Sequence, residues 1–356
     1  MKGGIDKYPQ FFHAGLMQET KAAVLRKLNA PLDLCQLMVP ELKQGQVLVK
    51  LAFSGLCRSQ LNEIKGFKGT DSYLPHTLGH EGSGTVVKLG SNVSKVKVGD
   101  HVILTWIKGE GHEVASTKYL CQGEIVNSGA ISTFSEYAVI SENRLIRIPF
   151  SIPLDEAALF GCAIPTGAGI LMNDLKVSPG KSIAILGMGG IGLSALLAAK
   201  AFNLHPIIAI DIEEAKLDLA KQLGATECIS TRDEKNLSAY TNCLDYAIES
   251  AGVKSAMEKA FSLVKPSSGI AVIAGNLPRG SCIELDPFDF ILGKKLIGTW
   301  GGGIQPDKDI PQLMEAFTKQ NISVKPLISH EFPLMEINQA IKLLEERQAT
   351  RILITL

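Results

Sequence analysis

The chain has 356 residues, which is more than a single compact core usually organises, so we expect two domains. Basic and acidic residues number 36 each, and this balance gives no electrostatic basis for binding nucleic acid. Hydrophobic residues make up 46% of the sequence, yet no apolar run approaches the roughly 20 residues that span a bilayer, so we expect no membrane segment. The N-terminus lacks the apolar core of a secretory signal, and the seven cysteines are irregularly spaced, so we expect a reducing cytoplasm rather than a disulfide framework.

The region before residue 163 is rich in short apolar or alternating runs separated by glycine. These runs predict strands over 46–53, 84–89 and 100–105. Such a pattern is typical of an irregular, mostly antiparallel β-domain.

A regular alternation of strand and helix begins near Lys176. Strands are predicted over 182–186, 206–210, 245–249 and 270–274, and helices over 190–203, 213–223 and 255–263. Gly224 is a stop signal for the second of these helices. Beyond the glycines at 301–303 the pattern predicts helices over 311–319 and 335–346 and a strand over 351–355. The alternation favours a doubly wound parallel sheet.

A glycine-rich hexapeptide follows the first strand of this series and opens its first helix. It matches the dinucleotide pattern G-x-G-x-x-G and consists of Gly187, Met188, Gly189, Gly190, Ile191 and Gly192. Gly187 permits the tight turn, Gly189 lets the backbone approach a pyrophosphate, and Gly192 allows close packing of helix on strand. We therefore expect a dinucleotide whose phosphates lie at the helix N-terminus.

Asp211 ends the next strand, 19 positions after Gly192. Its carboxylate would accept hydrogen bonds from an adenosine ribose and repel a 2′-phosphate, and no arginine occupies positions 212–214. These features favour NAD over NADP. FAD is the other candidate, but its fingerprint usually lies near the start of a chain.

Three widely spaced residues supply the ligand types of a catalytic zinc site. Cys57 lies in Gly-Leu-Cys-Arg-Ser, His80 in Gly-His-Glu-Gly, and Cys162 directly after Gly161. Two thiolates and an imidazole leave a fourth position of a tetrahedral zinc open for substrate. Taken singly, each residue is more often a buried cysteine or a hydrogen-bonded core histidine.

These blocks, together with Gly99-Asp100 and the stretch 298–302, make the chain resemble the medium-chain, zinc-dependent alcohol dehydrogenases over nearly all of its length beyond about residue 20. The last block is similar to the glutathione-dependent formaldehyde dehydrogenase branch. The resemblance implies an α/β fold, with a Rossmann-type NAD-binding domain over 164–300 and a mostly antiparallel, GroES-like catalytic domain formed by 1–163 and 301–356. It also implies oxidation of an alcohol to an aldehyde or ketone, and a homodimer or homotetramer formed through the cofactor domains.

The resemblance further implies roles for individual residues. Cys57, His80 and Cys162 would hold the zinc, with Glu81 behind the metal, and the Ser59 hydroxyl would take the alcohol proton. The remaining implied contacts are Arg58 and Arg351 at the cofactor pyrophosphate, Lys216 near the ribose, Thr166 at the nicotinamide and Trp106 in the substrate pocket. The three basic residues could instead be ordinary surface charges, and the tryptophan could be simple core.

The sequence departs from the family at three places. Only Cys121 lies in the segment 106–135, where many members have four cysteines for a structural zinc, so we expect one catalytic zinc and no structural zinc. Gln60 replaces the usual aspartate partner of a ligand histidine. Asn62, which cannot titrate, stands where several relatives have the last histidine of a proton relay. A second Gly-His-Glu, at 111–113, lies in a polar loop and is interpreted as unrelated to the metal.

Two other functions stay open. A zinc-free quinone or enone reductase would share the fold, but such enzymes lack the three ligands and usually prefer NADP. A non-catalytic NAD-binding protein would keep the fold without using the site.

Overall fold

The computed structural model describes residues 18–278 and 280–356, which form two compact units. We call them the barrel unit, made of the described part of Met1–Cys162 and of Ile328–Leu356, and the parallel-sheet unit, Ala163–Leu327. The boundary at Cys162 lies one residue from the expected one. The second boundary was expected at 301 and lies at 328, because helix α9 (Pro306–Lys319) packs against α3 (Ala163–Gly169) and α4 (Gly190–Ala201) of the parallel-sheet unit.

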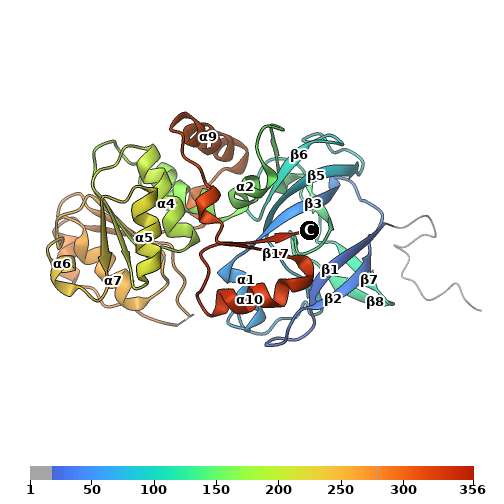
Figure 1. The fold of residues 1–356 in the computed structure, drawn as a ribbon, viewed down its shortest axis with the longest axis horizontal. Coiled ribbons are helices and arrows are strands. Elements are labelled where there is room, and N and C mark those ends of the chain that lie inside the picture. Colours follow the sequence, from blue (N-terminus) through green and yellow to red (C-terminus); the bar gives the residue numbers. More distant parts are fainter. Residues whose placement is uncertain (1–17, 279) are drawn as a thin grey trace, which may run out of the picture. The chain divides into compact units, whose positions relative to one another are not determined.

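The barrel unit contains two β-sheets (Figure 1). One closes into a barrel in the order β1 (Glu19–Leu25), β2 (Asp33–Met38), β7 (Lys118–Cys121), β8 (Glu124–Asn127), β4 (His76–Thr77). The other runs β10 (Leu145–Ile148), β6 (His101–Thr105), β5 (Glu81–Leu89), β3 (Gln46–Leu56), β18 (Ile352–Thr355), β17 (His330–Pro333), with β9 (Tyr137–Ser141) also paired to β3. Most pairs are antiparallel, which confirms the predicted character of this part of the chain.

Strand β3 is the central strand of the larger sheet, and its alternation builds two cores. Val47, Val49 and Leu51 pack into one apolar cluster, whereas Leu48 packs into another. Successive side chains of a strand point to opposite faces, so one run of apolar residues serves both clusters. All three strands predicted before residue 163 are confirmed, as β3, β5 and β6.

Three short helices complete the barrel unit: α1 (Arg58–Ile64), α2 (Leu154–Ala158) and α10 (Ile337–Glu345). Ile337, Ala340, Ile341 and Leu344 of α10 follow the i, i+3, i+4, i+7 spacing of a one-faced amphipathic helix and are buried. They share a core cluster with Leu61 and Ile64 of α1. The C-terminal segment therefore holds in place the helix that follows Cys57.

The parallel-sheet unit has six strands in the order β13 (Glu227–Ser230), β12 (Ile207–Asp211), β11 (Ile183–Leu186), β14 (Tyr246–Glu249), β15 (Ile270–Ile273), β16 (Lys295–Gly298). Its remaining helices are α5 (Glu214–Leu223), α6 (Glu234–Ser238), α7 (Lys254–Leu263) and α8 (Pro287–Ile291). All neighbouring strands are parallel. The chain adds strands outward from β11 on one side and then outward from β14 on the other, so the strand order reverses between β11 and β14. This is the doubly wound order, whose ligands bind at the carboxyl ends of the strands.

The helix boundaries agree with the sequence where a capping signal exists. Helix α5 ends at Gly224, which has a φ of 116°, the left-handed conformation that glycine adopts without strain. Helix α9 was expected to begin at 311 but begins at Pro306, because a proline fits the first turn, where no backbone donor is needed.

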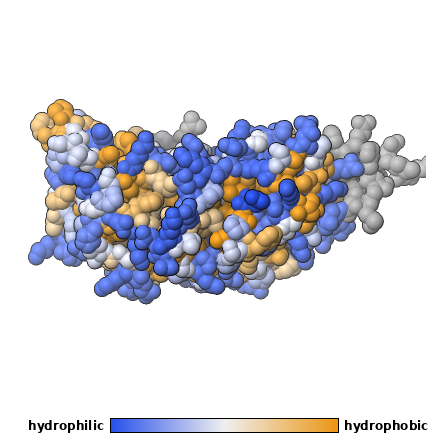
Figure 2. Space-filling model, turned by 90° about the horizontal axis from the view of Figure 1, so that it is seen from above, coloured by the Kyte–Doolittle hydropathy of each residue, from blue (hydrophilic) through white to orange (hydrophobic). Residues whose placement is uncertain are grey.

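The face drawn in Figure 2 is covered mostly by hydrophilic side chains, with hydrophobic patches between them. Among the residues that the structure describes, no single helix is long and apolar enough to cross a membrane; one bent pair, Leu154–Gly161 with Ala163–Asp174, passes on length and composition. Most residues of that pair are buried.

Candidate functional site

The barrel unit brings Cys57, His80, Glu81 and Cys162 together. Their thiol sulfurs, ring nitrogen and carboxylate oxygen all lie within 4.8 Å of one another. Cys57 joins β3 to α1, His80 and Glu81 stand at the start of β5, and Cys162 follows a 3₁₀ turn over Leu159–Gly161. The three ligands predicted from the sequence therefore meet in one place.

Two of the glycines in the matching blocks make room for Glu81. A Cβ atom added to Gly55 would lie 2.5 Å from Glu81 Oε1, and one added to Gly161 would lie 2.7 Å from Glu81 Cβ. Both distances are far shorter than van der Waals contact. The glycines beside Cys57 and Cys162 thus position a buried carboxyl between the ligands.

Three buried polar atoms of this cluster have no hydrogen-bond partner: His80 Nε2, Glu81 Oε2 and Arg351 Nε. Buried polar atoms are nearly always paired, so three such atoms in one cluster need an explanation. Two sulfur atoms and one imidazole nitrogen form the donor set that zinc prefers, at distances of about 2.0–2.3 Å from the metal. The residues present fit a zinc ion.

The two thiols differ in acidity. A hydrogen bond with Cys162 lowers the pKa of Cys57 well below its usual range, and His80 and Arg351 act in the same direction against burial. The hydrogen bond with Cys57, together with burial, raises the pKa of Cys162 well above its usual range. Zinc binds cysteine as the thiolate, so a divalent cation here would favour deprotonation of both sulfurs.

Arg351 lies next to Glu81 and not at the surface. It precedes β18, is 5% exposed, and forms an ion pair and a hydrogen bond with Glu81 Oε1. Burial raises the pKa of Glu81, and the guanidinium opposes this shift. The sequence reading missed this pair, since the two residues are 270 positions apart. The predicted contact of Arg351 with a cofactor pyrophosphate stays a prediction.

Ser59 and Gln60 both contact the imidazole of His80. Ser59 Oγ lies 3.2 Å from His80 Nδ1, and Gln60 Nε2 hydrogen-bonds the same nitrogen. Gln60 Oε1 accepts the backbone N–H of Cys57 at 2.9 Å. Gln60 thus links two ligands: its contact with the histidine was expected, but the amide nitrogen rather than the oxygen makes it, and the bond to Cys57 was not expected. Asn62 lies further along α1.

In the parallel-sheet unit, the glycine loop has the geometry that the sequence predicts. Gly187 has a φ of 95°, and a Cβ atom there would lie 2.7 Å from Ala251 N. A Cβ atom on Gly192 would lie 1.8 Å from the carbonyl oxygen of Gly187, whereas one on Gly189 would meet no atom within 4 Å. Gly190 begins α4, followed by Ile191. The backbone is thus tightly packed on two sides and open at Gly189, where a phosphate would approach.

Asp211 connects the end of β12 to this loop. It is 8% exposed; Oδ1 accepts the N–H groups of Ile212 at 2.8 Å and Glu213 at 3.0 Å, and Oδ2 accepts the N–H of Met188 at 2.5 Å. The sequence predicted the position of Asp211 but not its bond to the loop. The carboxylate therefore orders the glycine loop.

The other predicted residues are divided between the two units. In the parallel-sheet unit, Thr166 is buried in α3 and Lys216 is half-buried on α5. In the barrel unit, Arg58 is exposed at the start of α1, and Trp106 is half-buried against an apolar cluster. Their roles toward cofactor and substrate stay predictions.

A second group of possible ligands, Glu63, Asp71 and His76, was not found from the sequence. His76 Nε2 lies 2.8 Å from Asp71 Oδ2, its Nδ1 lies 3.0 Å from the carbonyl oxygen of Thr77, and Glu63 pairs with Lys68. Both ring nitrogens are already hydrogen-bonded, unlike Nε2 of His80. This group is therefore a hydrogen-bonded cluster.

The second Gly-His-Glu motif has a structural partner. The buried carboxylate of Glu142 accepts the backbone N–H groups of Ser94 at 2.9 Å, Lys95 at 3.1 Å and His112 at 2.9 Å, and it also contacts the His112 ring. Burial raises the pKa of Glu142, but the bonds from His112, Ser94 and Lys95 lower it to about 2. His112 is thus held by Glu142, away from the four-residue cluster.

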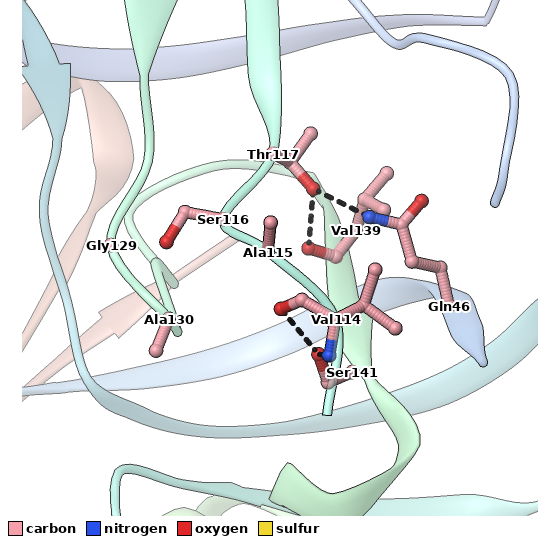
Figure 3. Close-up of a pocket in the computed structure, with 9 residues that line it drawn as sticks. All are labelled: Gln46, Val114, Ala115, Ser116, Thr117, Gly129, Ala130, Val139 and Ser141. Atoms are coloured by element: carbon pink, nitrogen blue, oxygen red, sulfur yellow. Dashed lines mark hydrogen bonds between the residues drawn. The ribbon is translucent and has the colours of Figure 1, made fainter. Parts of the chain in front are cut away.

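A depression of the barrel unit is drawn in Figure 3. There the Thr117 hydroxyl accepts from Gln46 Nε2 at 3.3 Å and donates to the Val139 carbonyl at 3.4 Å, while Ser141 Oγ bonds Val114. The space left for a water-sized molecule is about 0 Å³. With no room for a water-sized molecule, it is no candidate for a ligand site.

Known proteins share both the sequence and the fold. The family profile described as "Alcohol dehydrogenase GroES-like domain" matches residues 43–150, and the profile described as "Zinc-binding dehydrogenase" matches residues 190–319. S-(hydroxymethyl)glutathione dehydrogenase from Synechocystis is 32% identical, over 94% of this chain and 98% of that protein.

Solved structures agree. The alcohol dehydrogenase zinc-binding domain protein from Burkholderia ambifaria superposes with a TM-score of 0.89 and 29% identity, covering 96% of this chain and 99% of its own. Benzyl alcohol dehydrogenase from Acinetobacter calcoaceticus gives 0.86 and 29%, covering 95% and 99%. With the ligand cluster, the glycine loop and these similarities in agreement, the chain belongs to the medium-chain, zinc-dependent alcohol dehydrogenase family.

Proposed function

We propose that the protein is an NAD-linked alcohol dehydrogenase with one catalytic zinc per chain, interconverting an alcohol and an aldehyde or ketone. The observation that carries the proposal is the convergence of Cys57, His80 and Cys162 around an unpaired His80 Nε2. A zinc-free reductase would have no use for this donor set.

The residues of the cluster have separate tasks in this proposal. Cys57, His80 and Cys162 hold the zinc, which when bound supplies a Lewis acid that favours ionisation of an alcohol at neutral pH. Ser59 places its hydroxyl beside His80, where it would take the proton of the alcohol while passing its own proton to the cofactor ribose or to water. Glu81 and Arg351 form a charged pair behind the ligands that keeps the carboxylate from occupying the substrate position.

NAD is proposed as the dinucleotide. The open backbone at Gly189 and the carboxylate of Asp211 at the end of β12 support this choice, because a 2′-phosphate would meet a negative charge. Lys216 and Thr166 are the further cofactor contacts within the same unit, and Arg58 and Arg351 those supplied by the barrel unit.

For the substrate we propose a primary alcohol. Two of the similar proteins are named for S-(hydroxymethyl)glutathione and for benzyl alcohol, and both compounds carry a hydroxymethyl group. Trp106 would line the substrate pocket.

Metal analysis and a substrate screen test the proposal together. We expect roughly one zinc per chain, and NADH formation from benzyl alcohol, from S-(hydroxymethyl)glutathione or from a simple primary alcohol, with weaker turnover of secondary alcohols and polyols. Two zinc ions per chain would contradict the absence of a structural zinc. A zinc-free protein that reduces enones with NADPH would replace the proposal by its nearest alternative.

We also propose a homodimer or homotetramer formed through the parallel-sheet unit. Helix α8 exposes Phe288 and Ile291 at 58% and 77%, and the adjacent strand β16 ends the sheet. A second copy would cover such a surface. Light scattering after gel filtration should give the mass of a dimer or tetramer, and Ile291→Asp should shift it toward the monomer; a monomeric parent protein would contradict this assembly. The seven free thiols support the cytoplasm as the compartment.

A further inference from the structure

The amide of Gln60 has one acceptor, and the structure shows which donor uses it. A backbone N–H can only donate, so the atom 2.9 Å from the Cys57 N–H must be the amide oxygen, Oε1. Gln60 is the third residue of α1 and caps the N–H of the residue that precedes the helix. Its side chain is 2% exposed, so this orientation is set by protein atoms.

The amide nitrogen of Gln60 is then directed at His80. Nε2 of the amide can only donate, so His80 Nδ1 accepts in this arrangement. A neutral imidazole that accepts at Nδ1 carries its hydrogen on Nε2. No protein atom accepts that hydrogen, because His80 Nε2 has no hydrogen-bond partner among the described residues.

A zinc ion needs the opposite tautomer. If Nε2 of His80 binds the metal, the ring hydrogen moves to Nδ1 and requires an acceptor there. Gln60 Oε1 faces the Cys57 N–H, and the amide nitrogen that faces His80 Nδ1 has no lone pair with which to accept this hydrogen. Within the part of the chain that the structure describes, the other side chain bonded to Nδ1 is Ser59, with Oγ at 3.2 Å.

We propose that Gln60 makes Ser59 the acceptor that orients the zinc-binding histidine, so that the zinc affinity of the site depends on the Ser59 hydroxyl. The inference rests on the zinc site of the proposed function. It gives Ser59 a positioning role toward His80 in addition to its role toward the alcohol. An oxygen with two lone pairs can accept from both.

Zinc affinities of four proteins test this dependence: the parent, Ser59→Ala, Gln60→Glu and the double variant, each titrated against a chromophoric chelator. In the parent background, Ser59→Ala should weaken zinc binding about tenfold or more, the usual cost of losing a partner of a ligand histidine. Gln60→Glu supplies a second acceptor oxygen for Nδ1–H, so Ser59→Ala should change the affinity less than about twofold in that background. Ser59→Thr is the matched control, because it keeps the hydroxyl and should retain parental affinity.

Equal losses from Ser59→Ala in both backgrounds would overturn the inference, since Ser59 would then act independently of Gln60. A zinc-free parent protein would instead remove the proposed function.

The tautomer of His80 in metal-free protein gives a second readout that needs no zinc. ¹⁵N chemical shifts of the imidazole should show hydrogen on Nε2 in the parent and on Nδ1 in Gln60→Glu. Hydrogen on Nδ1 in the parent protein would also overturn the inference, and this measurement stands even where a variant fails to fold.

Discussion

Two glutamates of the barrel unit, Glu81 and Glu142, are equally buried and have opposite surroundings. Both side chains are 0% exposed. Backbone N–H groups surround Glu142, and its pKa is lowered to about 2. Glu81 has one charged partner, an unpaired oxygen, and a pKa raised by burial. Burial alone therefore does not identify a functional carboxyl, whereas incomplete hydrogen bonding in a cluster of ligand atoms does.

The difference follows from what each region must do. The loops around Glu142 are held by satisfied hydrogen bonds, each of which favours one geometry. The region around Glu81 keeps polar atoms unpaired, which costs stability and leaves donors available for a ligand. Disrupting the first region should lower stability, and disrupting the second should abolish metal binding.

The largest effect is expected at the ligand cluster. Cys162→Ala removes one of three protein ligands, so zinc should be lost and the alcohol dehydrogenase activity should fall by about a thousandfold or more. Zinc content and NADH formation measure it, with Cys228→Ala in β13 as the control thiol. Retention of zinc by Cys162→Ala would show that the cluster does not hold the metal.

The next largest effect is expected on stability, in the hydrogen-bonded region around Glu142. Glu142→Gln replaces one acceptor oxygen by a donor that faces backbone N–H groups, and should lower the free energy of unfolding by about 3 kcal/mol at pH 7. The folded-state pKa of about 2 lies below the ordinary value of 4.5, so the carboxylate stabilises the fold above pH 4.5 and loses this contribution as the pH falls toward 2. The difference in free energy of unfolding between parent and variant should therefore be large at pH 7 and small at pH 2.5.

Urea unfolding followed through Trp106, in a Trp300→Phe background, reports on the barrel unit. Zinc content of Glu142→Gln at neutral pH should stay that of the parent. An equal difference in free energy of unfolding at both pH values would contradict the role assigned to the Glu142 carboxylate.

Asp211 shares a feature with each of the two glutamates, and its substitution should have a smaller effect. It is hydrogen-bonded by backbone N–H groups like Glu142, yet it lies at the proposed ribose site. Asp211→Ser should weaken NAD binding about tenfold, with some gain for NADP, because a charge-assisted acceptor is lost. Fluorescence titration of both dinucleotides measures this change, with Asp218→Ser, at an exposed position of α5, as the control. An unchanged preference would remove Asp211 from cofactor selection.

The smallest effect is expected for a thiol outside the cluster. Cys121 is buried, and Arg26 Nη2 lies 3.7 Å from its sulfur. Cys121→Ser should leave roughly one zinc per chain and change stability by about 1 kcal/mol or less. Loss of zinc from this variant would reveal a second metal site.

Contiguous patterns of the sequence were the most informative about the structure. The glycine loop, the strands beside it and the stop at Gly224 depend on neighbours within a few residues, and all are confirmed. The edge strands β13 and β16 were missed, because they are more polar and less buried than the predicted four-residue strands β11 and β15. The expected boundary at 301 differs from the unit boundary at 328 for another reason: which unit α9 joins depends on packing, which local sequence does not encode.

The sequence predicted which residues form the metal cluster, but not the hydrogen bonds and the ion pair that connect the site residues. Cys57, His80 and Cys162 could be named because each lies in a recognisable block. The ion pair of Glu81 with Arg351 and the bond of Asp211 to Met188 join residues far apart in the chain, and nothing local marks them. The two bonds of Gln60 follow from the cap of α1 together with the position of His80, which only the folded chain brings together.

The placement of Arg351 has a consequence for biosynthesis. Cys57, His80 and Cys162 are made first, and 189 further residues (351 minus 162) must be added before the arginine appears. At 5–20 residues per second this takes about 10–40 s, long enough for the intervening parallel-sheet unit to fold on the ribosome. During that interval Glu81 is without the guanidinium that pairs with it in the finished protein. Metal capture before Arg351 emerges would therefore take place at a site of more negative charge than that of the finished protein.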